Sequence, residues 1–324
     1  MNDLLPARGR RPGFGVMINT FDSMGEGIVN VVAAAQEAEA LGIESVWVGD
    51  HLFFHSPNLE SVTTLAAMAG ATTQIGLGSG VLLPALRQPM VLAKQLATLV
   101  TLSAERFMLG VGVGGEFPPE WNAVGIDPAQ RGSRTDEFLE ILDGAFTGEP
   151  FTYRGSHHTI SIPAMLPAAN TPPIWVGGRS DAALERATRC ATGWLGMWSS
   201  PRRIVEVGER LEQLRTQLGR PDDVSRAMLI FVSTGVSDTR NQRVASFVEK
   251  HYRMPFEKIA RWMLRGEPAE IADILKEYLA AGVEDFILFP VTENPAGQFE
   301  FVRDIYESLQ PGRLSKQSVG SSVR

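Results

Sequence analysis

The sequence predicts a single closed (β/α)8 barrel of the TIM type, with insertions after strands 4 and 7. Eight short apolar segments alternate with eight longer segments of helical periodicity, roughly one pair every 40 residues. The strand-like segments, such as FGVMI, IGLGS and FILF, are almost continuously apolar, which is typical of parallel strands buried on both faces. Eight such units favour a closed barrel over an open, doubly wound sheet.

The expected elements follow from the apolar periodicity and from the residues that flank it. Gly42 ends the first helix, as glycine commonly does. Pro89 falls in the first turn of another helix, where its missing N–H is not needed. The expected strands are 14–19, 45–49, 75–79, 107–112, 173–177, 193–197, 228–234 and 285–289. The expected helices are 26–41, 59–72, 89–102, 131–146, 180–190, 202–218, 267–281 and 299–309.

Two segments interrupt this alternation and are interpreted as insertions. Residues 149–172 are expected to form a hairpin, and residues 235–266 a helical insert. Insertions in a barrel commonly occupy the loops after strands, so both are expected to line an active site. The barrel is expected to span residues 13–311, with disordered tails at 1–12 and 312–324.

Composition and charge exclude several classes of protein. The net charge of −7 argues against a nucleic-acid-binding surface. The single cysteine, Cys190, excludes an intrachain disulfide and a multi-cysteine metal site. No run reaches the roughly 18 apolar residues of a membrane span, and the first residues do not resemble a signal peptide. We therefore expect a cytoplasmic enzyme with neither a nucleic acid nor a membrane as partner.

The carboxyl ends of the strands are where a barrel enzyme places its active site. Asp50 and His51 follow the second expected strand and form the only carboxylate–imidazole pair at a strand end. An imidazole, with an ordinary pKa of about 6.5, suits general acid–base catalysis. The alternative is that Asp50 caps the next segment and His51 only packs. The other four histidines lack the carboxylate or cysteine partners of a metal site, so no metal is expected.

A glycine-rich run at 110–115 satisfies the pattern G-x-G-x-x-G after a strand. A dinucleotide-binding fingerprint would next open a helix, but two prolines follow and are expected to prevent one. The glycines are therefore expected to let a flat ring or a stretch of backbone approach closely.

A second turn, at Gly177, Gly178 and Arg179, ends a strand where a helix begins. Free amides at a helix N-terminus, together with an arginine, would bind a phosphate. The alternative is an ordinary strand-to-helix turn in which Ser180 caps the helix.

Four segments together resemble the bacterial luciferase-like flavin and deazaflavin oxidoreductases. They are VWVGDHLF (46–53), RFMLGVGVGGEF (106–117), QRGSRTDEFLEIL (130–142) and PPIWVGGRSDAALERA (172–187), in the family's order and at family-like spacing. The resemblance implies a TIM barrel that binds a flavin at its carboxyl-terminal mouth. It favours the deazaflavin coenzyme F420, with FMN as the alternative.

The resemblance also implies roles for single residues. Asp50 would meet the polar end of the ring system, and His51 would exchange a proton near its reactive edge. A non-prolyl cis peptide would lie beneath the ring at Gly80–Val81, or alternatively at Ser79–Gly80. The remaining cofactor residues would be Gly112 and Gly114 at the ring, and Gly177, Gly178 and Arg179 at the phosphate.

The implied reaction is hydride transfer between coenzyme F420 and a small apolar or aromatic alcohol, carbonyl or enone. Glu116 is a candidate acid, although one extra glycine shifts it relative to the family pattern. A sugar phosphate is not expected, because no lysines match those that bind the substrate phosphate in the sugar-phosphate dehydrogenases. Aromatic side chains would line the pocket: Phe21, Phe53, Phe117, Trp121, Trp198 and Trp262.

Two other functions stay open at this point. One is an FMN-dependent two-component monooxygenase that uses O2 and is supplied by a separate flavin reductase. The other is a non-catalytic flavin-binding protein. Because family members commonly dimerise, a homodimer is expected through the Ala- and Leu-rich segments 66–73 and 90–100.

Overall fold

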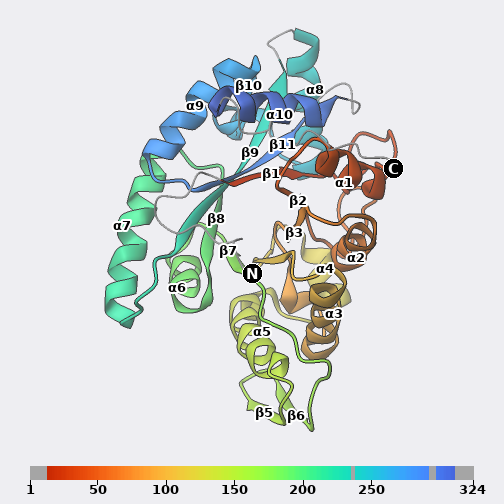
Figure 1. The fold of residues 1–324 in the computed structure, drawn as a ribbon, viewed down its shortest axis with the longest axis vertical. Helices are drawn as coiled ribbons and strands as arrows, with labels where there is room; N and C mark the ends of the chain where they lie inside the picture. The colour runs from red at the N-terminus through yellow and green to blue at the C-terminus, as the bar shows by residue number, and fades with distance from the viewer. Residues whose placement is uncertain (1–12, 235–237, 292–296, 311–324) are drawn as a thin grey trace, which may run out of the picture.

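The computed structural model describes residues 13–234, 238–291 and 297–310. Eight parallel strands close into a barrel in the order β1–β2–β3–β4–β7–β8–β9–β11, and β11 pairs with β1. Helices surround these strands (Figure 1). The predicted (β/α)8 barrel is therefore confirmed, while the predicted tails at 1–12 and 312–324 lie outside the described residues.

The barrel strands are short and almost entirely buried. They are β1 (Gly13–Met17), β2 (Ser45–Val48), β3 (Gly76–Ser79), β4 (Phe107–Val111), β7 (Ile174–Gly177), β8 (Gly193–Met197), β9 (Ser225–Thr234) and β11 (Asp285–Pro290). All eight were predicted, and the largest difference is at β9, which begins at Ser225 rather than 228.

The eight predicted helices are also present. They are α1 (Val31–Ala40), α2 (Ser61–Ala71), α3 (Pro89–Leu102), α5 (Arg131–Phe146), α6 (Asp181–Cys190), α7 (Pro201–Leu218), α9 (Pro268–Ala280) and α10 (Gln298–Leu309). The largest difference is at α1, which was expected from residue 26. It begins later because the Asn30 side chain caps it by accepting a hydrogen bond from the amide of Ala33.

Apolar side chains fill the barrel on both sides of the strands. One cluster joins the strands to the surrounding helices, and a second lies inside the barrel around Trp47 and Trp175. The interior tryptophans need glycine on the next strand: a Cβ on Gly78 would lie 2.3 Å from the Trp47 ring. Both faces of each strand are thus buried, which explains the continuous apolar runs.

The insertion after β9 lies at the carboxyl end of the barrel, as predicted for residues 235–266. It comprises α8 (Asp238–Tyr252), two 3-10 turns, η3 (Phe256–Lys258) and η4 (Ala260–Trp262), and the short strand β10 (Leu264–Gly266). Strand β10 pairs in parallel with β9 and extends the sheet beyond the barrel. Residues of this insert therefore stand beside the barrel mouth.

The predicted hairpin forms, but the expectation that it lines the active site is wrong. Strands β5 (Phe151–Arg154) and β6 (Thr159–Ile162) follow α5 and lead into β7, so they lie at the opposite end of the barrel. Figure 1 shows them beside α5, far from α8. Glu137 of α5 fastens the hairpin by accepting hydrogen bonds from the amides of Ser156 and His157.

A short helix after β4 was not predicted. The two prolines at 118 and 119 were interpreted as preventing a helix, yet they occupy the first turn of α4 (Pro118–Ala123). Proline is tolerated there because the first amides of a helix have no partner within it. Helix α4 buries Glu120 and Trp121 against the segment that follows β2.

Candidate functional site

The carboxyl ends of several strands and the insert after β9 enclose a cavity of about 140 Å³. Much of its lining is apolar, including Met197, Leu229 and Phe289. The structure brings five predicted site residues together around it: Asp50, His51, Gly80, Val81 and Glu116.

His51 lies between two carboxylates. Its Nδ1 is 2.8 Å from Oε2 of Glu120, and its Nε2 is 3.6 Å from Oε1 of Glu116. The ring also stacks on Phe54, with a centroid separation of 4.1 Å. Glu120 has 1% of its side chain exposed and Glu116 has 55%, so one partner is internal and the other faces the open side. This arrangement holds the imidazole in one orientation at the cavity.

Glu120 is a site residue that the sequence analysis missed. Its Oε1 accepts hydrogen bonds from the amides of Leu52, at 2.6 Å, and Phe53, at 3.4 Å. The carboxylate therefore binds the backbone on the carboxyl side of His51 as well as the ring itself. Glu120 lies in α4, a helix that the two prolines were taken to prevent, so no pattern in the sequence singled it out.

Asp50, next to His51 in the chain, points into the protein. Arg87 donates to both carboxylate oxygens at 2.7 Å, and the Ser61 hydroxyl and the Leu83 amide donate at 2.7 and 2.9 Å. No part of the Asp50 side chain is exposed. Asp50 was predicted to contact the polar end of a flavin ring, but no side-chain atom of Asp50 is exposed to such a ligand. Asp50 anchors Arg87 and the segment after β3.

The cis peptide expected at Gly80–Val81 is confirmed. The Val81 side chain packs against glycines of two neighbouring strands. A Cβ on Gly112 would lie 2.4 Å from Val81 Cγ2, and one on Gly177 would lie 3.0 Å from Val81 Cγ1. These glycines therefore leave room for the Val81 side chain.

Ser79 and Gly114 also make contacts within the protein. The Ser79 hydroxyl donates to the carbonyl of Gly110 at 2.9 Å, and Ser79 is buried. Gly114 has a φ of +55°, and a Cβ there would lie 2.9 Å from the Leu83 side chain. Both residues support the segment beneath the cavity.

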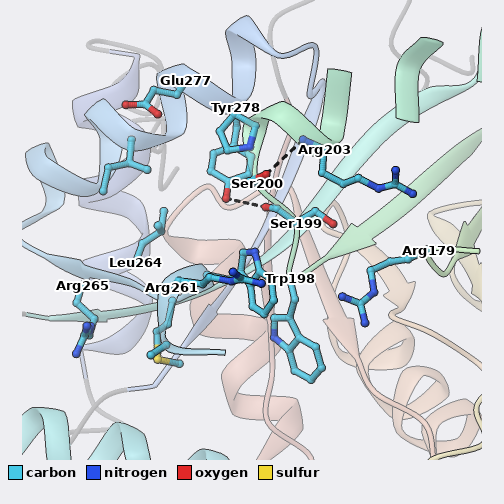
Figure 2. A pocket seen from close by; sticks show the side chains of 15 residues that line it. Arg179, Trp198, Ser199, Ser200, Arg203, Arg261, Leu264, Arg265, Glu277 and Tyr278 are labelled. Atoms are coloured by element: carbon cyan, nitrogen blue, oxygen red, sulfur yellow. Dashed lines mark hydrogen bonds between the residues drawn. The ribbon is translucent and has the colours of Figure 1, made fainter. Parts of the chain in front are cut away.

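A larger cleft of about 1000 Å³ lies beside the cavity at the carboxyl end of β8. Met197 lines the cavity and the next residue, Trp198, lines the cleft. Figure 2 shows Arg179 and Arg261 on either side of Trp198. Among the described residues neither arginine forms an ion pair, and the buried indole N–H of Trp198 has no hydrogen-bond partner. Guanidinium groups without an ion-pair partner suit an anionic ligand.

The turn that carries Arg179 has the capped form that was one of its two interpretations. Gly178 has a φ of +126°, and its carbonyl accepts a hydrogen bond from the Trp194 indole at 2.6 Å. Ser180 caps α6 by accepting from the amide of Ala183 at 3.3 Å. The capped turn is therefore present, and phosphate binding at Arg179 stays a prediction.

The insert adds His251 and Tyr252 to the cavity lining. His251 Nδ1 lies 2.6 Å from the Ser23 hydroxyl, and its ring stacks on Phe247. Burial, with smaller contributions from His51 and from another nearby imidazole, lowers the pKa of His251 to about 3. Burial, and then the charge of Glu116, raises the pKa of Tyr252. Both side chains are uncharged at neutral pH. Sequence reasoning missed His251 because it weighed that residue only as a metal ligand.

The six predicted pocket aromatics divide into four groups. Phe21 lines the cavity, while Trp198 and Trp262 line the cleft. Trp121 is wholly buried in a core cluster with leucines, so its prediction as a pocket residue is wrong. The rings of Phe53 and Phe117 pack edge to face, with their centroids 6.1 Å apart, and line neither the cavity nor the cleft.

Comparison with known families identifies the class of protein. The luciferase-like monooxygenase family matches residues 14–287, most of the chain, so the chain belongs to this family. The F420-dependent glucose-6-phosphate dehydrogenase of Kineococcus radiotolerans is 26% identical over 313 residues, covering 86% of this chain and 92% of the relative. The chain is therefore an oxidoreductase of the luciferase-like kind.

Two solved structures show the same fold. An F420-dependent secondary alcohol dehydrogenase, solved with an F420–acetone adduct, superposes with a TM-score of 0.78 at 18% identity, covering 93% of this chain and all of the other. The oxygenating constituent of 3,6-diketocamphane monooxygenase from Pseudomonas putida, solved with FMN, gives 0.76 at 18% identity, covering 93% and 98%. Within the described residues, no helix is long and apolar enough to span a membrane.

Proposed function

We propose that the protein is a coenzyme F420-dependent oxidoreductase that transfers hydride between the deazaflavin and a small apolar or aromatic alcohol, carbonyl or enone. The observation that carries the proposal is His51, fixed between two carboxylates at the mouth of a luciferase-like barrel. When bound, the deazaflavin supplies a carbon that accepts or gives up hydride. Hydride removal from an alcohol also releases a hydroxyl proton, for which His51 is the acceptor.

The two hollows fit a flat ring with an anionic tail. Val81 and the apolar lining of the cavity offer a surface on which a ring would rest. The amides of Gly177 and Gly178, with the unpaired side chain of Arg179, would hold the phosphate.

The cavity lining supports an uncharged substrate. Leu229, Phe231 and Phe289 are apolar, and His251 is neutral. Such a surface favours small alcohols, carbonyls and enones over charged molecules, because burying an unpaired charge there would be costly. Among the polar residues of the lining, which include Asn19 and Glu116, His51 is the proposed proton-transfer group.

A second candidate substrate class is favoured by Arg261. It lies over the Trp262 ring at 4.1 Å and, within the described residues, forms no ion pair. The cleft thus offers arginines where the sequence analysis looked for lysines. A substrate that carries a phosphate or carboxylate could place this group beside Arg261 while its hydroxyl reached His51.

Turnover assays test the proposal. In one assay, run without oxygen, the purified protein is mixed with oxidised coenzyme F420 and a panel of aliphatic, aromatic and phosphorylated alcohols. In a second assay it is mixed with the reduced coenzyme and a panel of enones. We expect the wild-type protein to reduce or oxidise the coenzyme, and we expect His51→Asn to lose this activity. Oxygen consumption with reduced FMN and a flavin reductase, without any reaction of coenzyme F420, would favour the monooxygenase instead.

We also propose the homodimer expected from the family. Helix α3 exposes Val91 and Leu102, at 57% and 55%, which supports a partner on this side of the barrel. Light scattering at micromolar concentration should give twice the 35.3 kDa of one chain. A mass equal to one chain would refute the dimer.

A further inference from the structure

We propose that Glu120 is a positioning residue that fixes the tautomer of His51, so that Nε2 presents a lone pair to the cavity. This inference rests on the proposed function, in which His51 accepts a substrate proton. It concerns the protonation of the His51 imidazole before any ligand binds. It can therefore be tested separately from the reaction.

The hydrogen bonds of Glu120 determine which ring nitrogen carries the proton. Oε1 is taken by the amides of Leu52 and Phe53, and Oε2 lies 2.8 Å from Nδ1 of His51. Because an ionised carboxylate only accepts hydrogen bonds, Nδ1 must be the donor. A neutral imidazole has one N–H, so Nε2 is then left without a proton.

The surroundings keep the ring from turning over. Glu120 is 1% exposed, so water does not compete for its carboxylate. Phe54 stacks on one face of the imidazole, and Asn58 donates to the backbone carbonyl of His51 at 2.7 Å. Nε2 is consequently directed toward Glu116 and the cavity.

The two carboxylates do different work on the same ring. Glu120, buried and at hydrogen-bond distance, sets the tautomer. Glu116 is 55% exposed and 3.6 Å from Nε2, beyond hydrogen-bond distance, so it does not fix the position of a proton. A buried carboxylate that orients an imidazole in this way is known to matter for general-base catalysis in hydrolytic triads.

A glutamine at position 120 should reverse the tautomer without changing the shape of the site. The amides of Leu52 and Phe53 need an acceptor, so the oxygen of the glutamine side chain must stay on their side. Its NH2 group would then face Nδ1 of His51. Because that group only donates, Nδ1 becomes the acceptor and the proton moves to Nε2.

Nitrogen-15 NMR of histidine-labelled protein, without cofactor and at pH 9, reads the tautomer directly. Signals of His51 are assigned by their loss in His51→Asn. We expect Nδ1 to be protonated in the wild type and unprotonated in Glu120→Gln. An unprotonated Nδ1 in the wild type, or the same state of Nδ1 in both proteins, would overturn the proposal.

Two control variants separate the tautomer from other effects of losing a carboxylate. Glu116→Gln removes the carboxylate on the Nε2 side and should leave Nδ1 protonated. Glu137→Gln removes another buried carboxylate that accepts backbone amides, on α5 and away from the cavity, and should change neither the tautomer nor turnover. A changed tautomer in Glu137→Gln would show that the NMR signal responds to any loss of a buried carboxylate rather than to the contact between Glu120 and His51.

Kinetics then connect the tautomer to the reaction. In Glu120→Gln, kcat should fall by about 10²–10³-fold, the size of a general-base contribution, while coenzyme binding stays within about twofold. Unchanged kcat together with a reversed tautomer would overturn the positioning role. If no protein in the series turned over coenzyme F420, the proposed function would fail, while the NMR result would still decide the tautomer.

Discussion

The cavity at His51 and the cleft at Arg261 adjoin each other but differ in how their polar groups are satisfied. In the cavity, Asp50 and His51 both have charged or polar partners within 2.8 Å. In the cleft, the described residues leave Arg179 and Arg261 without ion-pair partners, and Trp198 without an acceptor for its indole N–H.

This difference separates two tasks. Groups that take part in chemistry must keep one geometry, and paired, buried contacts provide it. Groups that bind a charged ligand need their hydrogen-bonding capacity to be free before the ligand arrives. We infer that proton transfer belongs to the cavity and anion binding to the cleft, and the following variants test this division.

The largest effect is expected at His51. His51→Asn keeps a side-chain N–H that can donate to Glu120 but removes the base, so kcat should fall by about 10³-fold. Coenzyme affinity, measured by fluorescence titration, should change little because the cleft is untouched. Wild-type turnover in this variant would remove His51 from the mechanism.

Asp50 should matter for stability rather than for chemistry. Asp50→Asn leaves the buried Arg87 without its main counter-charge, which should lower the free energy of unfolding by about 3 kcal/mol in urea denaturation. Asp273→Asn breaks an exposed ion pair with Lys276 and should cost about 1 kcal/mol or less. Normal stability with lost coenzyme affinity in Asp50→Asn would instead support its predicted contact with the ring.

His251 should make the fold sensitive to acid. Its pKa is about 3 when folded but ordinary when unfolded, so the unfolded chain binds the extra proton and stability is lost as pH falls below about 6.5. Between pH 7.5 and 5, wild type should lose about 2 kcal/mol more than His251→Asn. Urea unfolding at both pH values measures this, and equal losses would contradict the buried, neutral imidazole.

The smallest effects are expected in the cleft. Arg179→Gln should weaken coenzyme binding about tenfold, since it removes one charge-assisted contact, and Arg261→Gln should raise the KM of an anionic substrate by a similar factor. Added salt should reduce both differences. Arg202→Gln, on a side chain that is 90% exposed, is the matched control and should alter neither quantity.

Much of the fold could be predicted from the sequence because the signal is local. Apolar strand runs and helical periodicity marked all sixteen barrel elements, such as α3 at Pro89–Leu102. The local signal failed at α4, where prolines were taken as helix breakers although they sit at the helix start. The order of the predicted elements already placed the 149–172 hairpin between a helix and the next strand, at the amino end of the barrel, but it was interpreted as a loop after a strand.

The site was only partly predictable because its contacts are long-range. His51 could be found from its place after a strand, but its partner Glu120 lies 69 positions away in a helix that was not expected. Asp50 was selected with His51, although adjacent residues in an extended segment point in opposite directions. The glycines at 112 and 177 were predicted to bind a cofactor, and only the structure shows that the Val81 side chain packs against them.

The most direct test of the account is a side-by-side equilibrium titration of the purified protein with coenzyme F420 and with FMN, followed by fluorescence. The account predicts micromolar affinity for the deazaflavin, weaker binding of FMN, and loss of affinity in Arg179→Gln. Preferential binding of FMN, or binding of neither, would contradict it.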